Sequence, residues 1–517
     1  MATRRARVQF TIKRMKNFFN EFTQNKKAVV GVLIIAFYVA LAILGPILTP
    51  YDPTRSKDWY LAGRLAAPEW FFDLGWGELS KNLVLESYFP IGEEVSESKF
   101  TSTANKGCFI QYVSGVGNPA SSGPGSISIT YERQEQEPPT GKVYAYLSRQ
   151  FHFPYDGAPQ KILMKIALVT IGTTNEIGEL DIPATIRIFL ERIEENATIR
   201  YYMPTKTPKE THHSDLIGMS SLTNWQLYTS DSSTLSAELT WPTIEADMFS
   251  KKGEYIFGVE ILFNDLTPAS NERLKTTVFL DDLYMRLYGT AFGLLGTDYM
   301  GRDILTQFVH GARISLIVGL LSATLSVSIG LIFGLVSGYL GGLMDELMMR
   351  VNDMFLVLPG LPLLIVLMAV LGPSIWNIII LIGLLGWNGF ARLVRSQTLS
   401  LKERPFIESA KAIGASKFYI IRRHILPNVM ALVYVSLATS VPSAIVAEAA
   451  LSWLGLFDPH RMSWGRILRD INVTPGAAVK WWWMLPPGLS IAALSTAFIL
   501  IGYGLDEILN PKLRERR

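Results

Sequence analysis

The segment from Glu408 to Asn428 carries the pattern that points most clearly to a specific task. It reads ESAKAIGASKFYIIRRHILPN and separates two apolar runs. The stretch up to Ile413 predicts a short helical run, and Gly414 suits a turn or helix C-cap in which φ is positive. A second helical run is expected next, with one apolar stripe made of Phe418, Ile421 and Ile425. Two short helices joined rigidly to a membrane span would form a mechanical lever.

Two environments can be weighed for this segment. A basic amphipathic helix commonly lies on anionic lipid. Small side chains favour close docking into a groove of another protein instead, and the segment is rich in them: Ser409, Ala410, Ala412, Gly414, Ala415 and Ser416. The pattern therefore predicts a protein partner here.

Signatures of catalysis are missing from the sequence. It contains no G-x-x-x-x-G-K-[ST] phosphate loop, no G-x-S-x-G elbow and no H-E-x-x-H helix. Its six histidines are scattered, and the neighbours His212 and His213 are expected to face solvent. The single cysteine, Cys108, excludes an intramolecular disulfide and a multi-cysteine metal site. We expect this chain to be no enzyme itself and to hold neither a cofactor nor a metal.

Composition indicates a membrane protein with a polar insert. The chain has 517 residues, 49% of them hydrophobic and 18% charged, against roughly 25% charged in soluble domains. The apolar excess is concentrated in residues 28–48 and in the last 210 or so residues. A net charge of +3 without a basic stripe gives no reason to expect nucleic-acid binding.

Six apolar runs predict six transmembrane helices. Residues 28–48 carry no charge and are long enough to cross a hydrocarbon layer of about 30 Å. A cleaved signal peptide is the competing interpretation, but its apolar core is usually about 7–15 residues and an A-x-A-like site follows it; neither applies here. The other five runs are 315–338, 354–372, 375–394, 429–456 and 485–505.

Lysine and arginine predict the orientation, because they are enriched in cytoplasmic connections. They cluster in residues 1–27, in the connection 391–428 and in the tail 509–517. Alternation of six spans places these three segments on one side, which is therefore expected to be cytoplasmic. Both termini are then inside, and residues 50–290 are outside.

Within the spans, three small residues recur every four positions: Gly330, Gly334 and Gly338. They predict one helix face on which another backbone approaches closely. Pro359 and Pro362 interrupt the third span, which requires neighbours or local bends that satisfy the freed carbonyls. A packed bundle is favoured over a loosely packed anchor.

Glu448 is an acid near the outer end of the fifth span. Acids in membrane spans are costly and often functional. Two interpretations carry equal weight: Glu448 lines the pathway, where it meets a peptide amine, or it makes a structural hydrogen bond at an outer gate.

Residues 58–288 predict a β-rich domain. Apolar residues alternate with polar ones around 127–131, 186–190, 255–263 and 283–287, and this period of two is typical of strands with one buried face. Turn clusters such as 117–119 and 121–125 separate the strands. The arrangement suggests a two-sheet sandwich or a jelly roll.

The end of this domain, GEYIFGVEILFND…TTVFLDDLYMRLYG, resembles the last strands of carbohydrate-binding jelly-roll modules. Four aromatic residues can either stack on sugars or fill the core, and we favour the core: Tyr201, Tyr202, Trp225 and Trp241. Asp281 and Asp282 can hold Ca²⁺ only if both face it, but adjacent residues of a strand point to opposite faces. A solvated edge or turn is the preferred interpretation.

The segment from Glu408 to Asn428 resembles the E-A-A-x-x-x-G signature of ABC importer permeases. The matching positions are Glu408, Ala410, Gly414 with its neighbour Ala415, Leu426 and Pro427. Ser409 replaces the first alanine of the signature. His424 stands where the general signature has an apolar residue, as in the peptide-transporter branch.

Further blocks are similar to the second permease of the oligopeptide/dipeptide/nickel class. They are LLGTDYMGRDILTQFVHGARISLIVG (294–319), EAALSWLGLF (448–457), SWGRIL (463–468) and the end of the chain from 481 to 514. With the first span, the resemblance covers about 270 residues in the expected order. The large segment between spans one and two departs from the family, whose connection there is short.

The resemblance implies the type I importer permease fold and a multi-pass protein of a bacterial or archaeal inner membrane. It implies a second permease subunit as heterodimer partner, two ATPase subunits that bind ATP and Mg, an extracytoplasmic solute-binding protein and the surrounding lipid. The expected organisation is a tail (1–27), a first helix (28–49), an insert (50–290), an amphipathic segment (291–314), a core (315–508) containing coupling helices 405–427, and a tail (509–517).

Peptides are the expected substrate. Oligosaccharides are the alternative within the same class, and a membrane-anchored binding or sensory module without transport is the alternative of another class. Copurification of ATPase subunits separates the last from the others.

Overall fold

The computed structural model describes residues 21–87, 101–104, 107–119, 125–176, 179–194, 198–203, 216–220, 225–231, 244–268 and 272–509. The chain forms two compact units, one made of Met1–Trp59 with Arg302–Arg517 and the other of Tyr60–Gly301. The predicted turn 121–125 is described only at Gly125. His212, His213, Trp241 and the predicted cytoplasmic tails outside 21–509 lie outside the described residues.

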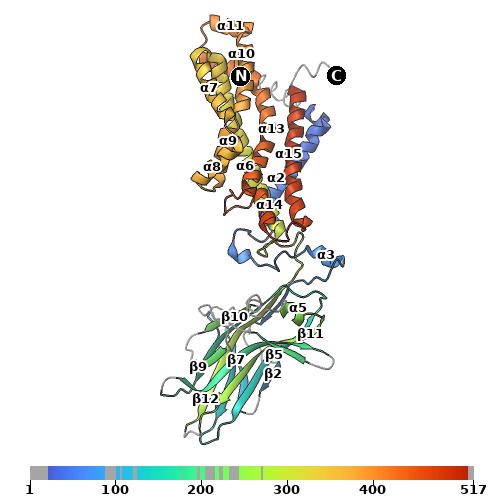
Figure 1. Cartoon of the computed structure of the whole chain (residues 1–517), viewed down its shortest axis with the longest axis vertical. Coiled ribbons are helices and arrows are strands. Elements are labelled where there is room, and N and C mark those ends of the chain that lie inside the picture. Colours follow the sequence, from blue (N-terminus) through green and yellow to red (C-terminus); the bar gives the residue numbers. More distant parts are fainter. Residues whose placement is uncertain are drawn as a thin grey trace, which may run out of the picture. The chain divides into compact units, whose positions relative to one another are not determined.

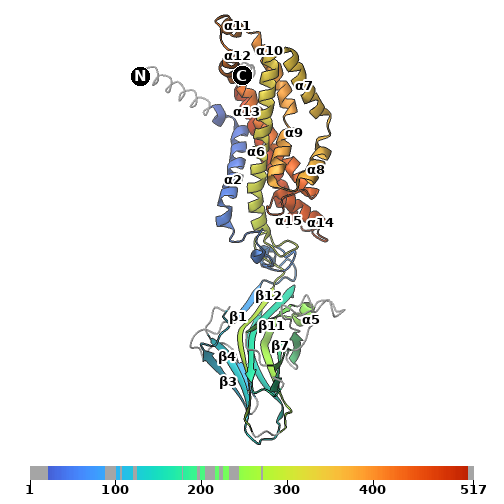
Figure 2. The ribbon, with the colours of Figure 1, turned by 90° about the vertical axis from the view of Figure 1, so that its left-hand side faces the viewer.

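The first unit is a helical bundle (Figures 1 and 2). Its longer helices are α2 (Lys26–Leu48), α6 (Ile304–Leu340), α7 (Gly342–Val357), α8 (Gly360–Leu371), α9 (Ile375–Leu385), α10 (Asn388–Lys402), α13 (Leu426–Trp453), α14 (Trp464–Val473) and α15 (Trp481–Leu509). Between α10 and α13 lie α11 (Pro405–Ala412), α12 (Lys417–Ile420) and a π-helical turn (Ile421–Ile425). A short 3₁₀ turn (Ser56–Asp58) follows α2.

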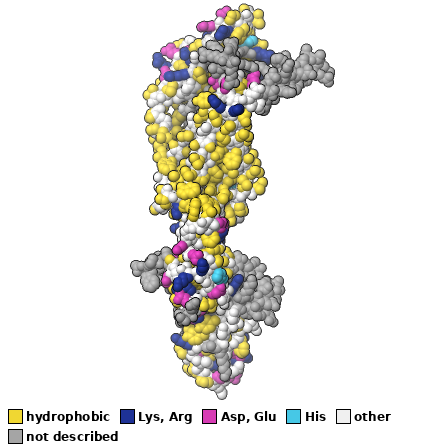
Figure 3. Space-filling view, turned by 90° about the vertical axis from the view of Figure 1, so that its right-hand side faces the viewer, with side chains coloured by type: hydrophobic (Ala, Val, Ile, Leu, Met, Phe, Trp, Pro, Cys, Tyr) yellow, Lys and Arg dark blue, Asp and Glu magenta, His cyan; other side chains and the backbone are white. Residues whose placement is uncertain are grey.

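Four helical stretches of this unit are long and apolar enough to cross a membrane: α2, α6, α12 through α13, and α15. Two further pairs of helices are long and apolar enough to cross a membrane only when each pair is counted as one bent span. The bend between α7 and α8 is 87°, and the bend between α9 and α10 is 40°. The number of spans is therefore four to six. Figure 3 shows mostly hydrophobic side chains along the middle of the bundle, with charged ones near its ends.

One predicted boundary differs from the structure. Residues 291–314 are expected as a separate segment before a span at 315, but α6 begins at Ile304 and is continuous to Leu340. Asp303 caps this helix, since its carboxylate accepts hydrogen bonds from the Thr306 amide at 2.8 Å and hydroxyl at 2.6 Å. The capped start extends the helix well beyond the apolar run.

The glycine face of α6 packs directly on α10. A Cβ atom on Gly330 would lie 2.8 Å from the carbonyl oxygen of Trp387, and one on Gly334 would lie 2.6 Å from that of Ala391. On Gly338 it would lie 2.8 Å from the Thr398 side chain. Only residues without a side chain permit this approach of two helix backbones.

The first and last helices of the bundle meet at one end. Asn25 caps α2 by accepting from the amides of Lys27 and Ala28, and it donates to Glu507 of α15 at 2.8 Å. A Cβ on Gly504 would lie 2.6 Å from the Cβ of Ala28. The chain therefore closes the bundle by pairing α2 with α15.

The second unit contains two six-stranded antiparallel sheets. One sheet holds β1 (Leu83–Ser87), β3 (Cys108–Ser114), β4 (Gly125–Arg133), β6 (Lys161–Gly172), β10 (Gln226–Asp231) and β12 (Leu274–Tyr288). The other holds β2 (Thr101–Ala104), β5 (Gly141–Phe153), β7 (Glu179–Ile193), β8 (Thr198–Met203), β9 (Leu216–Ser220) and β11 (Gly253–Asp265). Two short helices accompany them, α3 (Glu69–Asp73) and α5 (Ile244–Met248).

Apolar residues of both sheets form one core, as their alternation predicts. The buried positions include Ile127, Ile129, Tyr131, Ile186, Ile188, Leu190, Tyr255, Phe257, Val259, Ile261, Phe263, Leu283, Met285 and Leu287. β4 differs in one respect, because Ser126, Ser128 and Thr130 on its other face are buried too. Thr130 meets Thr277 of β12 at 2.9 Å, so neighbouring strands satisfy part of that face.

The expectation of a solvated edge at Asp281 and Asp282 is wrong. Asp281 is fully buried, and the pairing of β12 with β6 shifts register between Asp281 and Tyr284. Asp282 has a positive φ of 52°. This bulge lets both adjacent carboxylates reach Asn118, which donates its backbone N–H to Asp281 and its side-chain amide to Asp282. The two acids hold a turn.

The core prediction for the aromatic residues is correct only in part. Tyr201 packs against the core cluster, and Trp225 is half-buried. Tyr202 is exposed, and its hydroxyl donates to Glu260 at 2.9 Å. It alternates with Tyr201 along β8, so only one of the pair can face inward.

The two ends of this unit pair with each other. The amides of Leu61, Gly63 and Ala67 donate to carbonyls of Gly301, Gly289 and Thr290 at 2.7–2.9 Å. Because the chain enters and leaves side by side, a domain of this size fits between two consecutive helices of a bundle.

The α6–α10 contact makes a prediction about stability. Gly334→Ala should lower the stability of the purified chain by about 1–3 kcal/mol, because the new methyl group must push two backbones apart. Thermal unfolding in detergent measures this effect. Gly389→Ala is the matched control on α10, since nothing lies within 4 Å of its added Cβ. A Gly334→Ala chain as stable as the control would contradict the packing described.

Candidate functional site

The coupling segment, residues 405–427, lies at one end of the bundle, where α11 and α12 are seen in Figure 2. It connects α10 directly to α13. Pro405 begins α11, where its missing N–H costs nothing. Ser416 caps α12 by accepting from the amide of Tyr419 at 3.3 Å.

The turn between α11 and α12 explains three residues of the signature. Gly414 has a φ of +84°, which confirms the positive φ expected there. Its amide donates to Lys411, and the amide of Ala415 donates to the carbonyl of Ala410 at 3.1 Å. These two bonds form a Schellman turn, in which a glycine takes the left-handed position. A side chain at 414 would strain this turn.

One face of the coupling segment belongs to the bundle core. Ile407, Ala410, Ile420 and Ile425 are buried in a cluster with residues of α6, α10 and α13 such as Leu335, Val394 and Val429. Leu426 and Ala415 pack against the same cluster. Because this cluster joins the segment to three longer helices, a displacement of the segment is transmitted to them.

The other face is apolar yet exposed. Ile413 is 85% exposed and Phe418 is 72% exposed, and Phe406 and Tyr419 are also exposed. Glu408 and Pro427 lie on the exposed side as well. Such a group of large apolar side chains around a tight turn is typical of a protein interaction site.

The predicted stripe of Phe418, Ile421 and Ile425 is wrong in one position. Ile425 is buried and Ile421 is half-buried, but Phe418 is exposed and Ile420 takes its place in the core. The π-helical turn at Ile421–Ile425 is the reason. Its wider spacing brings residues five apart, Ile420 and Ile425, onto one face.

Ion pairs tie α10 to α7 near the coupling segment. Arg395 donates to both carboxylate oxygens of Asp345 at 2.6 Å, which is the bidentate geometry that arginine favours. Arg392 pairs with Asp353 at 2.5 Å. These contacts stiffen the α7–α10 connection beside the coupling segment.

A central cavity of about 510 Å³ opens among α6, α8, α9 and α13. Five hydroxyl side chains line it together with glycines and apolar residues: Ser322, Ser326, Thr439, Ser440 and Ser443. None of its described lining residues is charged. None of these five residues was expected to belong to a site. The signal was present in the spacing of Ser322 and Ser326, and of Thr439 and Ser443, four apart within apolar spans.

Glu448 lies away from this cavity. It is 2% exposed, and its Oε1 accepts a hydrogen bond of 2.7 Å from Ser452 one turn later on α13. Its neighbour Ala447 faces the cavity. The Oε2 of Glu448 is buried and has no hydrogen-bond partner among the described residues, so the pathway role and the structural hydrogen bond both stay predictions.

The π-helical turn predicts that substitutions at Ile420 and at Phe418 have different effects on stability. Ile420→Ser should lower stability by about 3 kcal/mol, because it leaves a hole and a hydroxyl in the core. Phe418→Ser should change it by no more than about 0.5 kcal/mol, since Phe418 faces outward. Thermal unfolding of the purified chain measures both. Equal losses would mean that the segment continues as a regular α-helix.

Comparisons with known proteins agree with this architecture. Residues 330–515 match the family described as "Binding-protein-dependent transport system inner membrane component". Residues 13–68 match the "N-terminal TM domain of oligopeptide transport permease C".

Individual proteins are similar to part of the chain. The dipeptide transport system permease protein DppC of Bacillus subtilis is 41% identical over 220 residues, which are 42% of this chain and 68% of that one. The glutathione transport system permease protein GsiD of Shigella flexneri is 42% identical over 224 residues, 42% of this chain and 72% of that one. A chain of the inward-facing MetNI methionine ABC transporter has 18% identity and a TM-score of 0.31, covering 40% of this chain and 95% of its own.

The coverage and identity of the dipeptide and glutathione permeases establish the family. The protein is a multi-pass inner-membrane protein, and it belongs to the binding-protein-dependent transport permeases, the ABC importer permeases of the oligopeptide class.

Proposed function

We propose that the chain forms one half of the membrane pathway of an ATP-driven importer, and that its coupling segment docks on an ATPase subunit. A second permease subunit supplies the other half. Two ATPase subunits bind ATP and Mg on the cytoplasmic side, and a solute-binding protein delivers substrate outside. In this arrangement each bent helix pair counts as one of six spans, and both termini are cytoplasmic.

The observation that carries the proposal is the two-sided coupling segment. Its outer face offers Phe406, Ile413, Phe418 and Tyr419 to a partner, and its inner face is part of the core shared with α6, α10 and α13. A lipid-facing helix needs no such rigid link. A partner that pushes on the outer face would therefore move the long helices.

The coupling segment is linked to the central cavity through the same helices. α6 and α13 contribute to the coupling cluster and also line the cavity. Closure of the ATPases would displace α11, and the helices around the cavity would rock between inward- and outward-facing arrangements. Packed interfaces switch between discrete arrangements rather than deforming continuously, so a small push can have this effect.

Short peptides are the substrate that the cavity suits best. Its uncharged lining of hydroxyl groups can bond the amide groups that every peptide has, without selecting a side-chain charge. The similar proteins named for dipeptide and glutathione transport support the same class. ATP hydrolysis is assigned to the partner subunits, so the chain is a transport protein without an enzymatic step of its own.

Oligosaccharides are the second candidate, and one surface of the 60–301 unit favours them. The outer face of its second sheet carries Tyr144, Tyr146, Phe189 and Tyr202 around the buried Glu260. Aromatic and acidic side chains of this kind suit sugar rings. However, the Arg200 guanidinium lies 5.3 Å from the Tyr146 ring centroid and 4.5 Å from that of Phe189, so it covers both.

We place the 60–301 unit outside the cell. We propose that its two sheets form a jelly-roll-like sandwich.

The coupling assignment predicts a specific defect. Glu408→Lys or Gly414→Asp in the assembled importer should abolish uptake while ATP hydrolysis continues, because the docking turn no longer fits its partner. Uptake into proteoliposomes and phosphate release measure the two activities. Glu346→Lys, on the exposed face of α7, reverses the same charge elsewhere and should leave both unchanged. Full uptake in both coupling variants would refute the assignment.

The substrate is tested by uptake of labelled tri- to pentapeptides and labelled oligosaccharides in cells with and without this chain. Deletion should abolish peptide uptake and leave sugar uptake intact, since the cavity lining is neutral and rich in hydroxyl groups. Loss of sugar uptake with peptide uptake preserved would reverse the ranking of the two candidates.

A further inference from the structure

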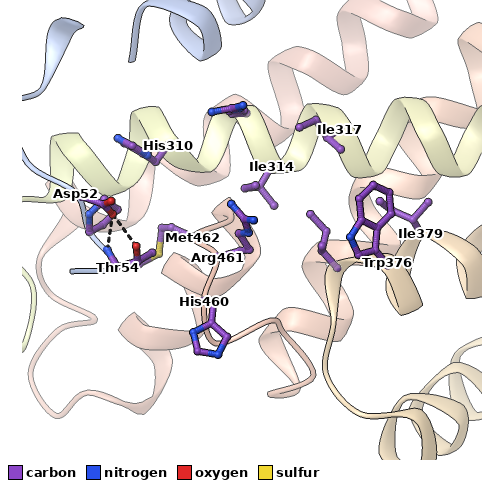
Figure 4. A pocket seen from close by; sticks show the side chains of 13 residues that line it. Asp52, Thr54, His310, Ile314, Ile317, Trp376, Ile379, His460, Arg461 and Met462 are labelled. Carbon is purple, nitrogen blue, oxygen red and sulfur yellow. Dashed lines mark hydrogen bonds between the residues drawn. The ribbon is translucent and has the colours of Figure 1, made fainter. Parts of the chain in front are cut away.

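A second cavity lies at the end of the bundle near α14, opposite to the end that carries α11 (Figures 1 and 2). Its volume is about 360 Å³, and Figure 4 shows it from close by. Four segments contribute to it: the stretch after α2, the start of α6, the start of α9 and the loop before α14. It shares no lining residue with the central cavity.

The polar part of this cavity is cationic. Arg313 and Arg461 both line it, and neither forms a salt bridge with a described residue. Nε2 of His310 is buried and has no hydrogen-bond partner in the described part of the chain. His460 adds another imidazole. The cavity therefore holds two guanidinium groups that are not paired with a described carboxylate, beside two imidazoles.

The one acid of the lining, Asp52, is occupied by its own loop. Its Oδ1 accepts from the amide and the hydroxyl of Thr54 at 2.9 and 2.7 Å, and its Oδ2 lies 3.1 Å from Nε of Arg55. Burial raises the pKa of Asp52, but the Thr54 hydrogen bonds and the Arg55 charge outweigh it and lower the pKa below its ordinary value. Asp52 thus bonds to Thr54 and pairs with Arg55 within its own loop, and not with Arg313 or Arg461.

Another part of the lining is apolar. Ile314, Ile317, Ile375, Ile379 and Trp376 form it. In Figure 4 the labelled polar side chains Asp52, Thr54 and His310 lie toward one end, and Ile317, Ile379 and Trp376 lie toward the other. Trp376 is 63% exposed. Tryptophan is the side chain most typical of the boundary between lipid headgroups and hydrocarbon.

The position along α6 agrees with such a boundary. Its 37 residues span roughly 55 Å at about 1.5 Å per residue, whereas the hydrocarbon layer is about 30 Å thick. The first turns, which carry His310 and Arg313, precede the apolar run that begins near 315. The cavity therefore extends from the headgroup level into the apolar layer.

We propose that this cavity binds an anionic phospholipid, with the phosphate between Arg313 and Arg461 and an acyl chain along Ile317, Ile379 and Trp376. Guanidinium groups match phosphate oxygens in pairs, and His310 supplies a further donor. A substrate carboxylate would meet the same charges, but a carboxylate alone makes no contact with the exposed apolar residues. The lipid explains both halves of the cavity.

Lipid titration of the purified full-length chain tests the proposal. Binding of dioleoylphosphatidylglycerol and of dioleoylphosphatidylcholine is measured by native mass spectrometry. The anionic lipid should bind more tightly to the unmodified chain. Replacing both arginines (Arg313→Gln with Arg461→Gln) should weaken its binding roughly thirty-fold, from about 1 kcal/mol for each arginine near a membrane surface. Trp376→Ala should weaken both lipids alike.

Control variants keep the test decisive. Arg350→Gln removes one exposed positive charge on α7 and should leave lipid binding unchanged. If the double glutamine variant fails to fold, Arg313→Lys with Arg461→Lys keeps the charges and loses only the guanidinium geometry. It should bind the anionic lipid more weakly than the unmodified chain and still prefer it over phosphatidylcholine.

Three results would overturn the proposal. The first is unchanged binding of phosphatidylglycerol by the double glutamine variant. The second is binding of free glycerol 3-phosphate as tight as that of the lipid, which would make this a site for soluble anions. The third is displacement of the lipid by trialanine but not by trialanine amide, which would make it a site for peptide carboxylates.

Discussion

The contact between α6 and α10 is the constraint on which the rest of the helical unit depends. Gly330, Gly334 and Gly338 leave room for the backbone of α10, with carbonyl oxygens where side chains would otherwise lie. α10 leads directly into α11, and α6 continues along the central cavity. Because the two helices touch without intervening side chains, a push on α11 has little slack to absorb before it reaches the cavity.

Two local turns in the coupling segment direct one of its faces into the bundle core and the other outward. A Schellman turn at Gly414 fixes the angle between α11 and α12. The π-helical turn then rotates the segment so that Ile420 faces the core and Phe418 faces outward. An exposed apolar face costs solubility unless a partner covers it, which is why the family's ATPase subunits are the expected occupants.

Much of this could be predicted from the sequence because it depends on short-range periodicity. Four of the apolar runs located helices that are long and apolar enough to cross a membrane, alternation located the buried strand faces, and Gly414 signalled its turn. Features that depend on one inserted residue or on distant neighbours could not be predicted. The π-turn shifted the stripe of Phe418, and a bulge turned Asp281 inward. Most of the hydroxyl groups of the central cavity appear in the sequence only as pairs spaced four apart, and their meeting in one cavity depends on how α6 and α13 pack.

The central claim is that the outer face of the coupling segment docks on an ATPase subunit. Site-specific incorporation of a photo-crosslinking phenylalanine analogue at Ile413 tests it in intact cells, because this side chain is 85% exposed and lies beside the Gly414 turn. The account predicts a crosslink to an ATPase subunit from position 413 and none from Val366, which is exposed on α8. Crosslinks from 413 only to lipid, or equally from both positions, would contradict it.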